Sequence, residues 1–250
     1  MSNLVKPTAP PPVLVLGCGR SGTSIFGELF ESTGCYEYRS EPEFADLLAW
    51  FASGRAAKVP VASAQYPADP GLSFPLSTLP EYAPRTRLFW IVRHPLDAIC
   101  SLRVGIGRGW RHHPRPPDWQ QWLDRSLIEQ CAHHWAFINS LGYAAVQQRA
   151  VLVRFEEMIH APAEFAERVC AELALAEAVD AAALSGWARR VQNSDNAQFI
   201  EAQTSRNHSR ADHSIRVGRW RENLSKAEVR QVLPIIASAS SSFGYDLNDL

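Results

Sequence analysis

The sequence VLVLGCGRSGTSIFGELF, residues 13–30, decides the fold that we predict for this chain. Its first four residues are apolar, a run long enough for a buried strand and too short for a helix. The last six carry apolar residues at helical spacing, and between the two runs glycines, serines and a threonine surround Arg20. A strand, a glycine-rich turn and a helix in this order form a cradle for phosphate. The glycines let the backbone approach the anion, and the helix N-terminus directs its N–H groups at the same oxygens.

The turn differs from the phosphate-binding loop of nucleotide kinases and ATPases, whose pattern is G-x-x-x-x-G-K-[ST]. Gly17, Gly22 and Ser24 fit that pattern. Thr23 stands where the lysine belongs, and the positive charge lies inside the loop, at Arg20.

Kinases also need Mg²⁺ ligands, usually including an aspartate after a second strand. Here the second strong strand, residues 88–92, is followed by Arg93 and His94, so a metal ion would face a cation. The sequence therefore predicts a phosphate site without a metal. A P-loop kinase for a small metabolite is the alternative enzyme, and it would require Mg²⁺ and ATP.

Composition restricts the classes of function. The chain has 250 residues and a net charge of −1, a balance that does not favour a nucleic-acid or anionic-membrane binder. No apolar run is long enough for a transmembrane helix, so we expect no membrane insertion. Five cysteines without a C-x-x-C pair predict neither a disulfide framework nor a metal site, and favour a cytoplasmic protein.

The rest of the pattern predicts a single domain. Residues 1–12 are a proline-rich arm, and residues 13–250 alternate apolar strands, among them 88–92 and 150–155, with helical segments. We predict an α/β fold of three layers, P-loop-like, in which helices flank a central parallel sheet. Residues 53–87 are rich in proline and read as an irregular insertion, either a lid that binds the acceptor or a surface loop.

Helices are also predicted on both sides of the later strand. Residues 119–148 and 163–191 read as helical, and a last helix begins at Ser225, where Glu228 completes a capping box.

Two further polar sites follow strands or helices. Arg93 ends the strand 88–92, at the edge where open parallel sheets bind ligands, and Ser101 lies two helical turns later. An arginine fork and a serine hydroxyl suit a phosphate, although Arg93 could instead pair with a surface acid. Glu41 and Glu43 precede a helix at 44–51 and are candidates for a catalytic carboxylate or for helix capping.

The segment 103–117 is a glycine- and proline-rich loop with four arginines, His112 and His113. It could hold an anionic substrate or be a solvated loop; RNA binding is disfavoured, because Trp110 is its one stacking platform.

Three separated motifs together resemble the sulfotransferases that use 3′-phosphoadenosine 5′-phosphosulfate (PAPS). Residues 19–24 resemble the family's 5′-phosphosulfate loop, in a version that contains arginine. The run RHPLD at 93–97 with Ser101 resembles its 3′-phosphate motif, and GRWR at 218–221 its C-terminal cofactor segment. The run RFEE at 154–157 resembles a short tyrosine-containing stretch of the family, with Phe155 in place of the tyrosine.

The resemblance implies a sulfuryl transfer from PAPS to an acceptor hydroxyl, or less readily an amine, of a carbohydrate or small molecule. The product 3′-phosphoadenosine 5′-phosphate (PAP) would leave, and no metal is required. The cofactor residues it implies are Gly19, Arg20, Ser21, Gly22, Thr23, Ser24, Arg93, Ser101, Arg219 and Trp220.

Glu41 is the implied general base, since it lies in a Glu-Pro turn like that of glycan-type members, and Arg20 the residue that stabilises the leaving phosphate. Glu43, His112, His113 and His208 are alternative bases. An inactive nucleotide-binding module is the alternative outside the enzymes. A homo-oligomer is compatible with the sequence.

Overall fold

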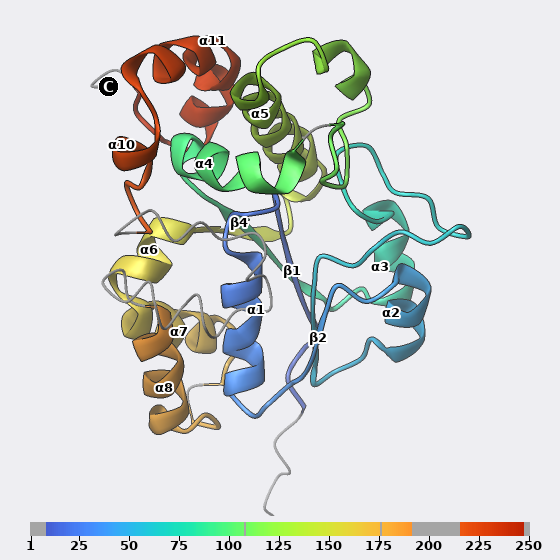
Figure 1. The fold of residues 1–250 in the computed structure, drawn as a ribbon. Coiled ribbons are helices and arrows are strands. Elements are labelled where there is room, and N and C mark those ends of the chain that lie inside the picture. The colour runs from blue at the N-terminus through green and yellow to red at the C-terminus, as the bar shows by residue number, and fades with distance from the viewer. Residues whose placement is uncertain (1–8, 108, 176, 192–215, 248–250) are drawn as a thin grey trace, which may run out of the picture.

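The structure is a computed structural model that describes residues 9–107, 109–175, 177–191 and 216–247. Its centre is a parallel sheet of five strands in the order β2-β3-β1-β4-β5. The strands are β1 (Val13–Gly17), β2 (Glu37–Ser40), β3 (Arg55–Lys58), β4 (Arg87–Val92) and β5 (Ala150–Arg154). Helices lie on both faces of the sheet (Figure 1), which confirms the predicted three-layer α/β fold.

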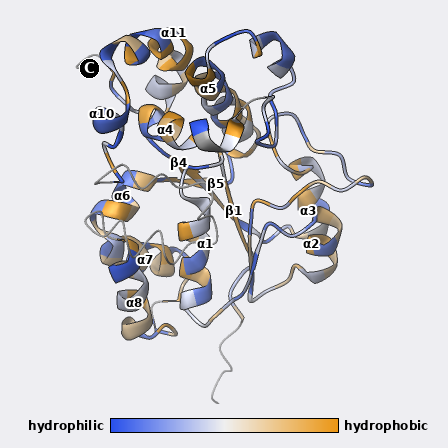
Figure 2. Ribbon diagram, in the orientation of Figure 1, coloured by the Kyte–Doolittle hydropathy of each residue, from blue (hydrophilic) through white to orange (hydrophobic). Residues whose placement is uncertain are grey.

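The central strands are buried on both faces, as a covered parallel sheet requires. Alternate residues of β1 and β4 point to opposite sides: Val13 and Phe89 join one hydrophobic cluster, and Leu14 and Trp90 join another. Hydropathy colouring shows the contrast between the hydrophobic β1 and the hydrophilic α10 (Figure 2). Continuous apolar runs therefore identified these strands from sequence.

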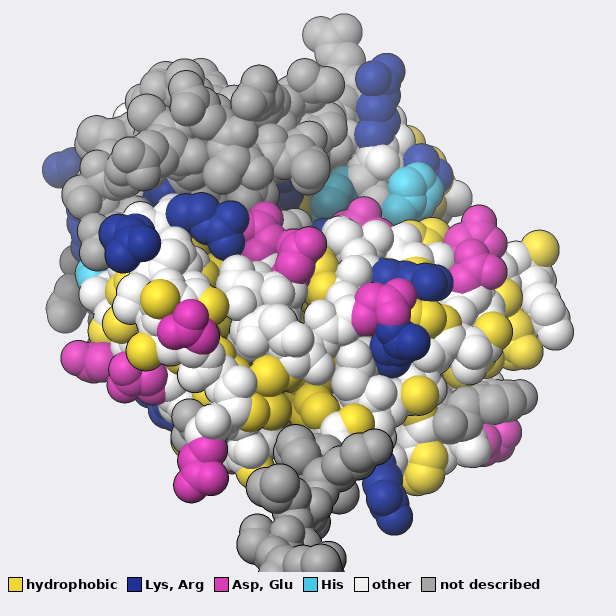
Figure 3. Space-filling model, turned by 90° about the horizontal axis from the view of Figure 1, so that it is seen from below, with side chains coloured by type: hydrophobic (Ala, Val, Ile, Leu, Met, Phe, Trp, Pro, Cys, Tyr) yellow, Lys and Arg dark blue, Asp and Glu magenta, His cyan; other side chains and the backbone are white. Residues whose placement is uncertain are grey.

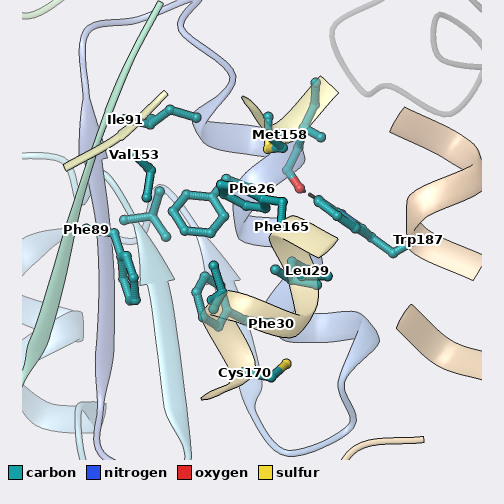
Figure 4. Close-up of a cluster of buried hydrophobic side chains, with 14 of the residues drawn as sticks. Phe26, Leu29, Phe30, Phe89, Ile91, Val153, Met158, Phe165, Cys170 and Trp187 are labelled. Carbon is teal, nitrogen blue, oxygen red and sulfur yellow. Dashed lines mark hydrogen bonds between the residues drawn. The ribbon is translucent and has the colours of Figure 1, made fainter. Parts of the chain in front are cut away.

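One face of the sheet is covered by α1 (Thr23–Ser32), α6 (Phe155–His160), α7 (Pro162–Glu172) and α8 (Ala181–Val191). Phe26 and Phe30 of α1 pack edge-on or tilted against Phe89, with ring centroids 5.4 and 6.0 Å apart. Trp187 of α8 closes the cluster and donates a hydrogen bond of 3.0 Å to the carbonyl of Ile25 (Figure 4). The start of α1, where the phosphate loop ends, is thus held by a packed aromatic core.

The opposite face is covered by α2 (Phe44–Trp50), α3 (Leu79–Tyr82), α4 (Pro95–Ile106), α5 (Leu127–Val146) and α11 (Lys226–Ser242). The short α10 (Trp220–Asn223) precedes α11, the 3-10 turn η1 (Leu76–Thr78) precedes α3, and the 3-10 turn η2 (Trp119–Trp122) lies between α4 and α5. Capping boxes begin α5 at Ser126 and α11 at Ser225, and the second confirms the predicted start of the last helix.

The prediction that residues 53–87 are irregular was wrong at its start and towards its end, where residues 76–82 form η1 and α3 and β4 begins at Arg87. Residues 55–58 form β3, an interior strand that pairs with β1 on one side and with the edge strand β2 on the other. Its sequence RAAK follows Gly54 and carries little strand propensity, so pairing on both sides stabilises the strand rather than local preference. Strand β2 was missed for the same reason, because three of its four residues are polar and exposed.

Residues 59–75 contain no helix or strand, and their role as a lid stays a prediction. Among the described helices, none combines the length and apolar character that crossing a membrane needs. On the face seen from below, acidic and basic side chains lie side by side (Figure 3).

Candidate active site

The phosphate loop connects β1 to α1, and its glycines are required by the geometry. Gly22 has φ 96°, and a Cβ there would overlap the ring of Phe155. Gly17 has φ 151° and lies against the carbonyl of Ile91. Arg20 itself adopts φ 68°, a left-handed conformation that costs a non-glycine residue energy and is typical of functional turns.

The loop carries a buried donor suited to an anion. The hydroxyl of Ser21 is buried and has no hydrogen-bond partner among the residues that the structure describes. A buried hydroxyl left unpaired costs free energy, so this group is well placed to bind a ligand oxygen. The 10-residue helix α1 begins directly after the loop, at Thr23.

The structure brings the two predicted phosphate motifs together. Arg20 Nε donates to Ser101 Oγ at 2.9 Å, although the two residues are 81 positions apart. Arg93 donates to the carbonyl of Arg20 at 3.2 Å and to the carbonyl of Arg216 at 2.6 Å. Arg93 therefore joins the phosphate loop to the C-terminal segment.

The alternative that Arg93 pairs with a surface acid was wrong. Its side chain is 6 % exposed, lies 4.2 Å from the ring centroid of Phe155, and bonds to carbonyls. Its Nε has no partner within the described ranges. Burial and the nearby charge of Arg93 lower the pKa of Arg20. Two arginines this close favour a bound anion, because it would offset their repulsion.

The predicted C-terminal cofactor segment lies against the start of α4. Asp97 accepts hydrogen bonds from the backbone N–H of Gly218 at 2.7 Å and of Trp220 at 2.9 Å. Arg219, between them, is buried. The Trp220 ring stacks parallel to His94, with centroids 6.2 Å apart.

The candidate base Glu41 lies on the other side of the phosphate loop. It has φ 51°, its side chain is 58 % exposed, and its Oε1 is 2.7 Å from the Nζ of Lys58. Lys58 is buried and also donates to Ser24 Oγ at 3.0 Å. This lysine connects the candidate base to the phosphate loop.

Sequence reasoning missed Lys58. The available signal was a lysine at the C-terminal end of an apolar segment, the edge where parallel sheets bind ligands. That signal was hidden because β3 itself was not predicted. Within the described residues, no group of three or more His, Cys, Asp or Glu side chains is placed to hold a metal ion.

A cavity of about 810 Å³ opens beside the loop. Gly17, Gly19, Thr23 and Glu41 line it, together with residues of the segments 59–73 and 112–117. His112 lies directly over Gly19, where a Cβ would overlap its ring.

The lining of the cavity separates the candidate bases into those that face it and those that do not. Glu41, His112 and His113 line it, whereas Glu43 is not among its lining residues. Glu43 instead stands at the N-cap of α2 without a side-chain capping bond. His208 lies outside the described residues.

The comparisons with known proteins agree with this geometry. A sequence model of the family described as "Sulfotransferase domain" matches residues 10–239. A search of curated protein sequences found no match.

Solved structures show the same fold at low identity. The mouse sulfotransferase SULT7A1 complexed with PAP superposes with a TM-score of 0.59 at 14 % identity, covering 92 % of this chain and 85 % of that one. Retinol dehydratase in complex with androsterone and PAP superposes with a TM-score of 0.55 at 14 % identity, covering 98 % of this chain and 84 % of that one. The sulfotransferase domain from the curacin biosynthetic pathway superposes with a TM-score of 0.51 at 14 % identity, covering 95 % of this chain and 99 % of that one.

Proposed function

The chain belongs to the sulfotransferase family, and we propose that it transfers a sulfuryl group from PAPS to a hydroxyl of a neutral small molecule. Family membership confirms the resemblance of its motifs and displaces the kinase alternative. The observation that carries the cofactor assignment is the contact between Arg20 and Ser101, which joins the 5′- and 3′-phosphate motifs in one site.

The residues present fit PAPS. The glycine turn admits an anion close to the backbone, and the Ser21 hydroxyl and Arg93 Nε are buried donors without partners among the described residues. Arg93 and Ser101 would hold the 3′-phosphate, which distinguishes PAPS from ATP. PAPS supplies the activated sulfuryl group.

The chain's own groups would then act on the transfer. Glu41 would take the proton of the acceptor hydroxyl, and bound PAPS would supply the sulfuryl group to that oxygen, with PAP as the leaving group. Arg20 and the N–H groups of residues 21–24 stabilise the charge that develops on the departing phosphate. Lys58 holds Glu41 beside the loop at 2.7 Å, which limits the positions that the carboxylate can take.

The cavity supports a neutral acceptor rather than an anionic one. Asp69 accepts from the backbone N–H and hydroxyl of Ser77 at 2.8 and 3.0 Å. Arg115 donates to the carbonyl of Trp110 at 2.7 Å and lies 4.4 Å over the ring of Trp119. The charged groups in the walls are therefore engaged within the protein.

The predicted basic loop contributes less charge to the cavity than its composition indicates. Arg103 bonds to the carbonyl of Asn223 and lies 3.6 Å from Glu228, and it is not a lining residue. The other lining residues that the structure describes include valine, alanine, leucine and proline side chains, and none of them is Phe, Tyr or Trp. A largely aliphatic alcohol of small-molecule size suits such walls, because apolar pockets bind apolar bodies and orient them by few polar groups. The androsterone bound by retinol dehydratase supports an acceptor of this kind.

A transfer assay with PAPS and a panel of acceptors tests the proposal. The panel contains a neutral alicyclic alcohol, a flat phenol, an anionic sugar and a primary amine, and mass spectrometry follows sulfated product and PAP. We expect metal-independent product formation, greatest with the alicyclic alcohol. Transfer to the anionic sugar alone would contradict the proposed acceptor, and PAP binding without any product would favour the inactive module.

A further inference from the structure

We propose that Asp97 is a positioning residue for recognition of the 3′-phosphate. Asp97 would support this recognition by fixing the C-terminal segment 216–220 against the start of α4. This inference rests on the proposed function, since it concerns how the same cofactor site is assembled.

The first observation is the use of both carboxylate oxygens. Oδ2 accepts the N–H of Gly218 at 2.7 Å, and Oδ1 accepts the N–H of Trp220 at 2.9 Å. The side chain is 1 % exposed. Two charge-assisted bonds to alternate residues of one segment fix its backbone, and Arg219 lies between the two fixed points.

The second observation is where Asp97 sits relative to the predicted phosphate residues. Arg93 precedes α4, and Asp97 and Ser101 are four residues apart on it, which places them on the same helix face. Arg93 also donates to the carbonyl of Arg216 at 2.6 Å. The segment is therefore held by one residue of the phosphate motif and by Asp97 within that motif.

Helix stabilisation alone does not account for this aspartate. An acid in the first turn favours the positive end of its own helix, and a capping acid bonds that helix's N–H groups. The N–H groups that Asp97 accepts belong instead to a segment more than 120 residues later. The Asp97 carboxylate therefore stabilises the contact between α4 and the C-terminal segment.

Glu156 of α6 provides a matched control, because its carboxylate also contacts the start of α4. Its carboxylate accepts the backbone N–H of His94 at 2.7 Å and the hydroxyl of Tyr245 at 2.8 Å. It thus makes two hydrogen bonds near the start of α4, as Asp97 does. Neither of these two bonds reaches residues 216–220.

The test compares affinities for PAP and 5′-AMP, which lacks the 3′-phosphate, in the wild type, Asp97→Asn and Glu156→Gln. An amide can accept one N–H but opposes the other. We expect Asp97→Asn to lower the affinity for PAP by about tenfold, the scale of one charge-assisted hydrogen bond. The affinity for 5′-AMP should fall by less than about twofold. In Glu156→Gln the ratio of the two affinities should stay near the wild-type ratio even if Tm falls.

Kinetics give a second readout. The KM for PAPS in Asp97→Asn should rise more than kcat at saturating PAPS falls, with little change in the KM of the acceptor. If Asp97→Asn does not fold, Asp97→Glu keeps the charge but displaces the segment, and it should show the same selective loss. Faster hydrogen exchange at the amides of Gly218 and Trp220 should accompany the loss.

Parallel weakening of PAP and 5′-AMP, or an unchanged ratio, in a folded Asp97 variant would overturn this role and leave the proposed function standing. Failure of the wild type to bind PAP would overturn the proposed function itself, and this role with it.

Discussion

The two sides of the site are built differently. On the cofactor side, Ser21, Arg93 and Ser101 are buried: Arg93 directly follows β4, Ser101 lies in α4, and Ser21 lies in the turn between β1 and α1. On the acceptor side, Glu41 is 58 % exposed and the cavity walls are residues without helix or strand. Regular elements therefore determine where the phosphates would lie, whereas loops determine what the acceptor would be. Substitutions on the two sides should separate cofactor affinity from turnover and acceptor selection.

The largest separation is expected from Glu41→Gln. The amide keeps the shape of the carboxylate but cannot take the acceptor proton, so kcat should fall by about 10²–10⁴-fold. PAP affinity should stay nearly unchanged, since Glu41 lies across the loop from Arg93. Pre-steady-state product formation and calorimetry measure the two quantities. Glu43→Gln is the matched control, and equal losses in both variants would remove Glu41 from the mechanism.

The comparison also explains what could be predicted from sequence. The cofactor side depends on short motifs at element ends, such as Arg93 and Ser101 eight positions apart, and local spacing carries them. Lys58 could not be predicted, because its place depends on pairing of β3 with both neighbouring strands. The acceptor cavity depends on contacts between loops distant in sequence, as where His112 covers Gly19, and no local pattern encodes these.

Arg93→Ala should produce the next largest effect, and on the cofactor side. Loss of its fork should weaken PAP by about 10–100-fold, the range for hydrogen bonds to charged groups, and should weaken adenosine 5′-phosphosulfate less. Tm should also fall, because the bonds to the carbonyls of Arg20 and Arg216 disappear. Exposed Arg85→Ala is the control. Equal weakening of both nucleotides would show that Arg93 does not read the 3′-phosphate.

Gly19→Ala should have a moderate effect, and it should act on the acceptor side although Gly19 belongs to the phosphate loop. Gly19 is outside the left-handed region, so the obstacle to a Cβ is the His112 ring rather than backbone strain. We expect the ring to move, which would raise the acceptor KM several-fold while PAP affinity changes by less than about threefold, because a displaced contact costs little beside a lost charged bond. Adding His112→Ala should remove the overlap, so Gly19→Ala should change the acceptor KM less in the His112→Ala background than in the wild type. Equal changes in both backgrounds would contradict the contact.

The smallest effect that we expect is a pH dependence of the free energy of unfolding, caused by the buried His134. His134 is fully buried, and its Nδ1 accepts a bond from Trp110 at 3.3 Å. Burial holds its pKa well below the usual value, with the nearby His112 and His133 acting in the same direction. The folded state thus keeps His134 neutral while the unfolded chain binds a proton below about pH 6.5.

Stability from this group is therefore complete above about pH 6.5 and decreases as pH falls, by up to about 1.4 kcal/mol per pH unit. His134→Gln retains an acceptor for Trp110 and should reduce the slope of unfolding free energy between pH 6.5 and 5. His160→Gln, at the end of α6, is the control. Identical slopes in wild type and His134→Gln, measured by urea denaturation, would contradict the assignment.

The central claim is that this fold binds PAPS through both of its phosphate groups. Calorimetric titration of the wild-type protein with PAP in the presence of EDTA, beside 5′-AMP and Mg²⁺-ATP, tests it most directly. We predict one PAP bound per chain without metal, far more tightly than 5′-AMP. Preference for Mg²⁺-ATP, or equal affinity for PAP and 5′-AMP, would contradict the account.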